Sequence, residues 1–123
     1  MEVFAAADWD VIGVSRAGGV VGSRGRQAVW DVTDDDVVAL TEVLRDDPLD
    51  LLINNAGTGT PGTPLDDVDI QALLEVCDVN VGGVIRATRA VLPNLRAATD
   101  PLVINVSSRL GSVHDQRAGG GVL

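Results

Sequence analysis

The sequence contains no tyrosine and no lysine, and its 123 residues include one cysteine, Cys77, and one histidine, His114. A single cysteine excludes an internal disulfide framework, and together these scarcities argue against a metal site built from cysteine and histidine. All nine basic residues are arginine, and 18 acidic residues bring the net charge to −9. We therefore expect no nucleic-acid partner, because no basic face is available to neutralise phosphates.

Long apolar runs are also missing. No run approaches the roughly 18 residues that a membrane-spanning helix needs, and the N-terminal segment has acidic residues but no basic region typical of a secretory signal. We expect a cytoplasmic protein with no membrane partner. Hydrophobic residues make up 46% and charged residues 22%, which predicts one globular domain over residues 1–123. Cys77 is interpreted as a small buried helix residue and His114 as a surface residue.

Apolar runs and helical patterns alternate along the chain. Strands are predicted over residues 9–14, 27–32, 49–53 and 101–106. Helices are predicted after Thr33, over about 65–75 and over about 78–97. This alternation is typical of an α/β fold with a parallel sheet.

Several residues predict local features of these helices. Thr33 and Asp36 have the spacing of a capping box at a helix start. Gly82 and Gly83 lie inside a predicted helix, where glycine is unfavourable, so we expect close packing against a neighbour to compensate. Pro93 is expected to kink the same helix or weaken its last turns.

Four short motifs in order and spacing resemble those of the short-chain dehydrogenase/reductase family. They are Asp31–Val32–Thr33, Asn54–Asn55–Ala56–Gly57, Asp78–Val79–Asn80–Val81 and Asn105–Val106–Ser107–Ser108. The resemblance covers about residues 3–123, and the serine-containing run is most similar to the C-factor-like carbonyl reductases. It implies a Rossmann-like doubly wound parallel sheet and hydride transfer between a nicotinamide cofactor and a carbonyl or alcohol. A sugar-nucleotide epimerase or a methyltransferase fits these motifs less well.

The resemblance implies roles for individual residues. Ser108 matches the catalytic serine that hydrogen-bonds the substrate oxygen, and Asn80 matches the asparagine whose backbone holds a water of the proton relay. Asp31 matches the acceptor for the adenine amino group, with Val32 beside the ring. The segment that runs beside the adenosine ribose corresponds to Asn55, Ala56 and Gly57, after a sheet-bracing Asn54. Read without the resemblance, these residues are strand-end hydroxyls, caps and turns.

Arg16 bears on the choice of cofactor, because it directly follows the first predicted strand and Ser15. At that place in dinucleotide-binding folds an acidic residue binds the ribose of NAD, whereas an arginine accommodates the 2′-phosphate of NADP. We therefore expect NADP in preference to NAD. Arg24 and Arg26 are candidates for the same cationic patch. The alternative interpretation of Arg16 is a solvated surface residue.

Two family motifs are missing from this sequence. No TGxxxGxG loop lies between a first strand and helix, and the absence of tyrosine and lysine excludes YxxxK. We interpret the chain as truncated at both ends: an incomplete Rossmann-type domain that lacks its first strand and C-terminal half, and is inactive as given. In the family's sheet the strand order is 3-2-1-4-5-6, so the missing first strand would lie between strands 2 and 4. The four strands present would then form two pairs, 3-2 and 4-5. These pairs close together, stay apart or accept a strand from a partner chain.

Catalytic and non-catalytic readings both remain open. As an enzyme, the chain belongs to an NADP-preferring oxidoreductase whose partner is a small carbonyl or alcohol. As a non-catalytic remnant, it serves as an interaction module through its open sheet edge. A homo-oligomer is a candidate assembly in either case.

Overall fold

The computed structural model describes residues 2–18, 25–59 and 63–108. It contains strands at all four predicted places. They are β1 (Ile12–Ser15), β2 (Arg26–Val29), β3 (Leu51–Asn54) and β4 (Leu102–Asn105). The helices are α1 (Glu2–Ala6), α2 (Val38–Leu44), α3 (Ile70–Cys77), α4 (Gly83–Ala90) and α5 (Leu92–Ala97), with a 3₁₀ turn, η1 (Leu65–Asp67), and a π-helical turn, η2 (Asp78–Gly82).

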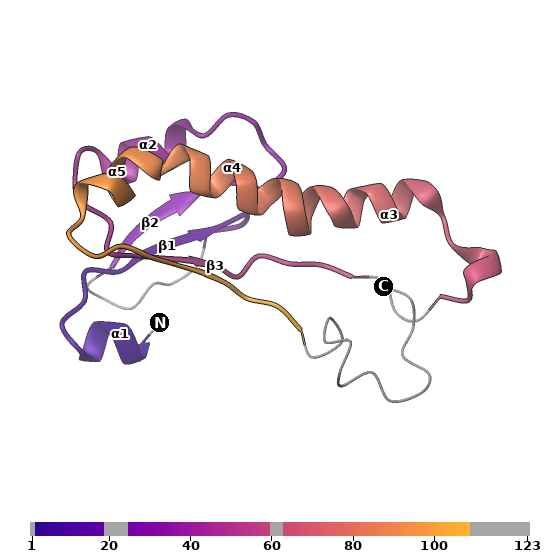
Figure 1. Cartoon of the computed structure of the whole chain (residues 1–123), viewed down its shortest axis with the longest axis horizontal. Helices are drawn as coiled ribbons and strands as arrows, with labels where there is room; N and C mark the ends of the chain where they lie inside the picture. Colours follow the sequence, from indigo (N-terminus) through magenta and orange to yellow (C-terminus); the bar gives the residue numbers. More distant parts are fainter. Residues whose placement is uncertain (1, 19–24, 60–62, 109–123) are drawn as a thin grey trace.

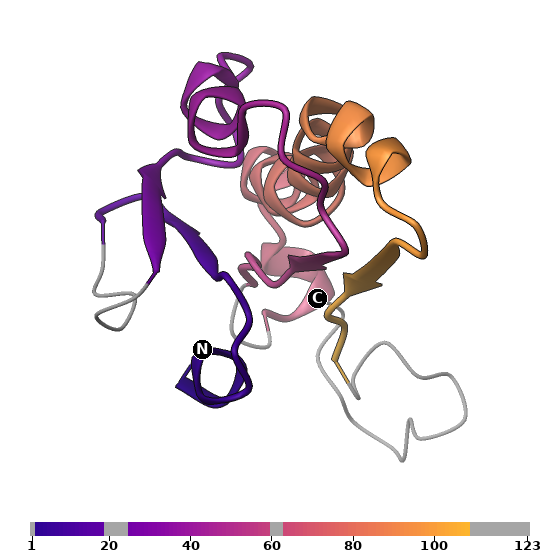
Figure 2. The same ribbon diagram turned by 90° about the vertical axis from the view of Figure 1, so that its left-hand side faces the viewer.

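The strands form two separate parallel pairs. β1 pairs with β2, and Ser15 lies opposite Val29, whereas β3 pairs with β4, and Asn54 lies opposite Asn105. In the described residues no ladder of hydrogen bonds joins the two pairs. Figure 2 shows them side by side, with β1 and β3 as the inner strands. The partial Rossmann-like α/β fold is thus confirmed, with its strand pairs apart.

One helical layer covers both strand pairs. Helices α2, α4 and α5 lie on one face, and α1 lies on the opposite side (Figures 1 and 2). The core cluster consists of Leu44 of α2, Leu95 of α5 and Val91 between α4 and α5, and Ile12 of β1 and Leu52 of β3 both pack against it. Apolar contacts with the shared helical layer therefore hold together two sheets between which the described residues form no ladder.

The acidic segment before α2 overturns the predicted capping box. The helix begins at Val38 without a side-chain cap, whereas Thr33 donates its hydrogen bonds to Asp31. Asp34 accepts from the backbone N–H of Asp36 (2.9 Å), and Asp36 accepts from that of Val38 (3.0 Å). These local side-chain bonds compete with helical ones and delay the start of the helix.

The two long helices predicted after residue 64 are each divided. The first becomes η1 and then α3, whose cap is Asp69, accepting from the backbone N–H of Gln71 at 2.9 Å. The second begins as the π-helical turn η2, which the sequence pattern did not predict, and continues as α4. It breaks at Val91, and Pro93 lies in the first turn of α5, so the expected disruption near this proline is confirmed.

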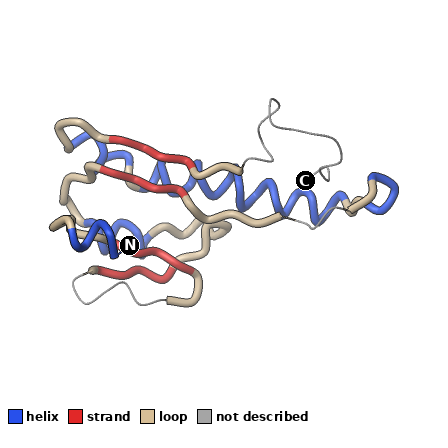
Figure 3. The backbone as a smooth tube through the Cα atoms, turned by 90° about the horizontal axis from the view of Figure 1, so that it is seen from below, coloured by secondary structure: helices blue, strands red, loops and turns tan. Residues whose placement is uncertain are grey.

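The predicted close packing of a glycine is confirmed at Gly83. A Cβ atom there would lie 2.8 Å from Cβ of Val32, closer than such atoms approach one another. Helix α4 thus presses directly against the segment that follows β2. The interpretation of Cys77 is wrong: it is exposed, because α3 extends past the strands and has no buried residue (Figures 1 and 3).

None of the helices in the described ranges has the length and apolar character needed to span a membrane.

Candidate functional site

Parallel pairing brings most of the predicted site residues to one edge of each sheet. Arg16 directly follows β1 and Asp31 follows β2 by two residues. Asn55–Gly57 directly follow β3, and Ser108 lies three residues beyond β4. Ligands of open α/β folds bind in the crevice outside these carboxyl ends. The topology therefore places the candidate residues where such folds bind their ligands.

Arg16 and Asp31 meet at the end of the first sheet. Arg16 Nε lies 3.9 Å from Asp31 Oδ2, and the arginine side chain is 79% exposed. Asp31 Oδ1 accepts hydrogen bonds from the backbone N–H of Thr33 (2.9 Å) and from its hydroxyl (2.7 Å). These two bonds, and then the charge of Arg16, lower the pKa of Asp31. Asp31 is therefore a carboxylate acceptor beside an accessible cation.

Arg26 does not join Arg16 in a cationic patch, contrary to the sequence-based expectation. It lies at the start of β2, opposite Ile12, at the other end of the strand pair. Its guanidinium donates to Asp10 (2.7 Å), to Asp47 (2.9 Å) and to the carbonyl of Val43 (2.9 Å). These partners come from distant parts of the sequence, so the composition around Arg26 did not reveal them. Arg24 and His114 lie outside the described residues.

Asn54 braces the second sheet, as expected. Its side-chain nitrogen donates to Asn105 Oδ1 on the neighbouring strand (2.8 Å) and to the hydroxyl of Thr88 on α4 (3.3 Å). The backbone N–H of Val106 donates to the carbonyl of Asn54 (2.9 Å), which continues the ladder beyond β4. Ser108 is exposed just past this point. The brace therefore fixes where the serine segment leaves the sheet.

Asn80 lies in the η2 turn and reaches the loop after β3. Its Oδ1 accepts from the backbone N–H of Thr58 at 2.9 Å, and its Nδ2 donates to the carbonyl of Thr58 at 2.8 Å. A Cβ on Gly57 would lie 3.5 Å from Asn80 Oδ1. The structure thus joins the predicted catalytic asparagine to the predicted ribose-side segment. Sequence reasoning missed Thr58, because the contact uses only its backbone.

Val32 occupies a position between the candidate site and the helical layer. Its side chain packs against Gly83 of α4, where a Cβ on the glycine would also lie 2.9 Å from Val32 Cγ2. Its carbonyl accepts a hydrogen bond from Arg86 at 3.3 Å. The segment that contains Asp31 is thus packed against the helix that continues from the Asn80 turn.

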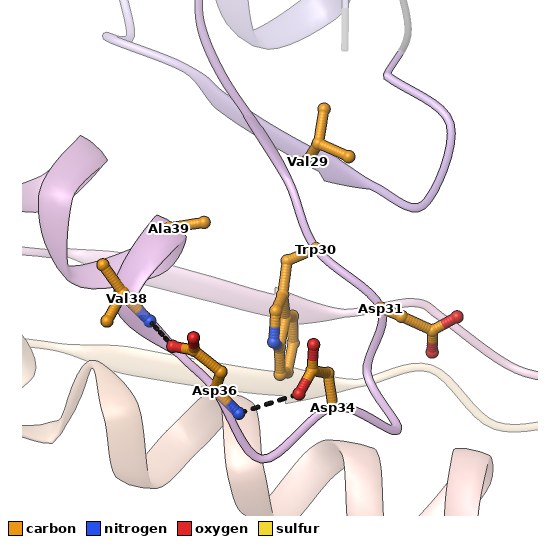
Figure 4. A pocket seen from close by; sticks show the side chains of 7 residues that line it. All are labelled: Val29, Trp30, Asp31, Asp34, Asp36, Val38 and Ala39. Atoms are coloured by element: carbon orange, nitrogen blue, oxygen red, sulfur yellow. Dashed lines mark hydrogen bonds between the residues drawn. The ribbon is translucent and has the colours of Figure 1, made fainter.

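A pocket of about 320 Å³ lies between the end of β2 and the start of α2 (Figure 4). Its lining residues are Val29, Trp30, Asp31, Asp34, Asp36, Val38 and Ala39. Trp30 is buried, and its indole nitrogen has no hydrogen-bond partner in the described part of the chain. Asp34 and Asp36 already accept backbone hydrogen bonds. Of the predicted site residues, Asp31 borders this pocket.

Comparison with known proteins identifies the family. The sequence profile described as short chain dehydrogenase matches residues 19–119. The chain belongs to the short-chain dehydrogenase family. It is 36% identical over 95 residues to cis-4-hydroxycyclohexanecarboxylate dehydrogenase of Sinomonas cyclohexanicum, a match that covers 72% of this chain and 38% of that protein.

Two further similarities agree with this family. The C-signal protein of Myxococcus xanthus is 40% identical over 73 residues, or 59% of this chain and 44% of that protein. A Burkholderia multivorans protein assigned to the short-chain dehydrogenase/reductases, solved with bound NADP, superimposes with a TM-score of 0.81 at 25% identity, covering 96% of this chain and 56% of that one. The chain thus spans less than half the length of the two curated relatives.

Proposed function

We propose that this member of the short-chain dehydrogenase family is an NADP-preferring oxidoreductase that transfers hydride between NADP and a carbonyl or alcohol. Family membership supports a nicotinamide cofactor in general. The preference for NADP rests on one observation, the exposed Arg16 guanidinium beside Asp31 at the carboxyl ends of β1 and β2. A planar guanidinium matches the geometry of a phosphate.

The described residues suit the adenosine half of such a cofactor. Asp31 is held ionised by Thr33 and offers an acceptor to the adenine amino group, while Arg16 offers donors to a 2′-phosphate. The exposed, small residues Ala56 and Gly57 allow a ribose to approach the backbone closely. Bound NADPH would supply hydride to a carbonyl, and bound NADP⁺ would accept it from an alcohol. The residues named here would hold the adenosine half of that cofactor.

Ser108 and Asn80 are the proposed catalytic residues. The hydroxyl of Ser108 would donate a hydrogen bond to the substrate oxygen and stabilise charge that develops there. Asn80, fixed by Thr58, would hold the π-helical turn at which a water of the proton relay binds. The printed sequence contains no tyrosine or lysine to act as the general acid and its partner. We therefore propose that the 123-residue chain alone has little or no turnover.

Isothermal titration with NADPH and NADH tests the cofactor proposal. We expect weak binding, with dissociation constants above the micromolar range and a lower constant for NADPH than for NADH. Arg16→Ala should reduce NADPH affinity about tenfold and leave NADH affinity unchanged, because only NADPH has the 2′-phosphate. The matched control is Arg89→Ala, because Arg89 is an exposed arginine on α4. Equal affinities in the wild type, or an unchanged preference in Arg16→Ala, would contradict the proposal.

The separation of the two strand pairs favours a second candidate, a non-catalytic interaction module. β1 and β3 are not paired with each other in the described residues, so each presents unpaired backbone groups to an incoming strand. Under this alternative, neither nucleotide binds in the titration. A concentration-dependent increase in mass during analytical ultracentrifugation would then favour association through the strand edges.

A further inference from the structure

Arg86 of α4 contacts two segments that both belong to the candidate site. Its Nε donates to Asp35 Oδ1 at 2.6 Å, and its Nη2 lies 2.8 Å from Asp78 Oδ1. Its Nη1 donates to the carbonyl of Val32 at 3.3 Å. Its side chain is only 24% exposed, although Asp35 is 90% exposed. One guanidinium thus joins the segment after β2 to the first residue of the π-helical turn.

The glycines beside Arg86 make this arrangement possible. A Cβ on Gly82 would lie 2.7 Å from Arg86 Nη1 and 2.7 Å from Asp78 Oδ1, so the guanidinium lies across the turn only because that position is glycine. Gly83 allows the helix to approach Val32 in the same way. The two glycines therefore provide space for the ion pairs and for the helix contact that accompanies them.

The turn that Arg86 holds is also the turn that contains Asn80. Asn80 in turn binds the backbone of Thr58, in the loop after β3. A continuous series of polar contacts therefore runs from Val32 and Asp35, through Arg86 and the η2 turn, to Thr58. It connects the carboxyl end of the first strand pair to that of the second. No ladder joins these pairs in the described residues, so these polar contacts help to hold the two pairs in a fixed arrangement.

Charge and geometry both favour arginine over lysine at position 86. The hydrogen bond to Asp35 and then that to Asp78 raise the pKa of Arg86, a side chain whose guanidinium is in any case protonated in proteins. Its three contacts use three different nitrogens, pointing to three different partners. A lysine ammonium is a point charge on a flexible side chain, so it cannot reproduce this forked arrangement of three donors in fixed directions.

We propose that Arg86 is a positioning residue that holds the adenine-side segment, Val32–Asp35, in a fixed arrangement with the Asn80 turn and the loop at Thr58. This inference rests on the proposed function for its consequence, namely that the two halves of the nucleotide site stay aligned. Its structural part concerns the chain alone and is tested without nucleotide.

Hydrogen exchange at single amides provides that test. In Arg86→Met we expect the amides of Asp34 and Thr58, which donate to Asp31 and Asn80, to exchange about tenfold faster. The amide of Trp30, which donates to Ser15 within the first sheet, should keep its rate. Arg89→Met, one turn further along α4, is the matched control and should change none of them. Unchanged rates, or an equal increase at all three amides, would overturn the proposal.

Milder variants separate the two ends of the link and serve if Arg86→Met does not fold. Asp35→Ala should accelerate exchange at Asp34 and spare Thr58, whereas Asp78→Ala should do the reverse. Arg86→Lys should behave like Arg86→Met, and full recovery of protection by lysine would contradict the role of the fork.

Titration with NADPH provides the functional readout. Arg86→Met should weaken NADPH binding about tenfold, whereas Arg89→Met should leave it unchanged. If the wild-type chain does not bind NADPH, the proposed function fails, while the exchange experiment still decides whether Arg86 aligns the two segments. If NADPH binds equally well to Arg86→Met, the positioning role is wrong although the proposed function stands.

Discussion

Asn80 satisfies both ends of its side-chain amide with the backbone of a single residue, Thr58, at 2.9 and 2.8 Å. The two residues are 22 positions apart, and they lie on the turn between α3 and α4 and on the loop after β3. An amide used in this way fixes both the position and the orientation of the loop. Asn80 therefore has a structural role in addition to the catalytic role proposed for its turn.

The first prediction concerns this pair of bonds. Asn80→Ala should lower the free energy of unfolding by about 1–2 kcal/mol, because it removes two hydrogen bonds of modest net value. Asn80→Asp should also destabilise, since a carboxylate accepts from the N–H of Thr58 but repels its carbonyl. Urea unfolding measures both effects. Asn55→Ala is the control, because the exposed Asn55 side chain makes no hydrogen bond within the described part of the chain; an equal loss there would contradict the assignment.

The second prediction concerns Gly83. Alanine is favoured over glycine by about 1 kcal/mol in a helix, but here its Cβ would overlap with Val32. We expect steric strain to dominate, so that Gly83→Ala destabilises by about 1–3 kcal/mol. Gly59→Ala, where a Cβ meets nothing within 4 Å, should have a much smaller effect in the same thermal melts. Trimming Val32 to alanine should not rescue Gly83→Ala, because the overlap involves the Cβ itself.

The third prediction concerns the titration of Asp31. Hydrogen bonds from Thr33 lower the pKa of this carboxyl, so its ionised form favours the folded state at pH values above its unfolded pKa of about 3.9. That contribution is lost as the pH falls through the lower, folded-state pKa. Carboxyl chemical shifts measured by NMR between pH 7 and pH 2 report this value directly.

Two variants resolve the causes of this shift. Thr33→Val removes the hydroxyl donor and should raise the pKa of Asp31 towards its ordinary value. Arg16→Ala should raise it less, because the arginine is 3.9 Å away and highly exposed. A larger effect from Arg16→Ala would show that the ion pair, and not the turn at Thr33, controls this carboxyl.

The fourth prediction separates Arg26 from cofactor binding. Arg26→Ala breaks contacts with Asp10, Asp47 and the carbonyl of Val43, and should destabilise by about 1–2 kcal/mol. In 1 M NaCl the difference should shrink, because exposed ion pairs are screened. NADPH affinity should stay at the wild-type value. A selective loss of NADPH binding would instead support the original assignment of Arg26 to a cationic patch with Arg16.

Local sequence patterns were sufficient for the four strands and for the family. Apolar runs predicted all four strands, and four motifs were enough to indicate a dinucleotide-binding fold. Gly83 was predicted to pack closely, because a glycine in a helix needs compensation. These features depend on neighbouring residues or on fixed spacing, which a linear sequence displays directly.

Other features were decided by contacts that the sequence pattern did not reveal, some local and some between residues far apart in the chain. Asp34 and Asp36 each accept a hydrogen bond from a backbone N–H two residues further on, and the helix does not start at Thr33 as expected. The spacing of Thr33 and Asp36 does not show which of these local hydrogen bonds forms. Cys77 was expected to be buried because free cysteine is among the most buried residue types, but α3 projects beyond the sheets that would have buried it. Arg26 was expected in a cationic patch, but it pairs with Asp10 and Asp47, which are 16 and 21 residues away in the sequence.

The sequence by itself determined which segments become strands and which short motifs lie at the carboxyl edge, because backbone preference and hydrophobic periodicity act locally. Only the tertiary structure decided that the two strand pairs stay apart under a shared helical layer, and that Arg86 and Asn80 connect their edges. Arg86 and Asp35 are 51 residues apart, as are Asn54 and Asn105. Such contacts form when packing of the whole chain brings distant polar groups within hydrogen-bonding distance, and no local pattern encodes that distance.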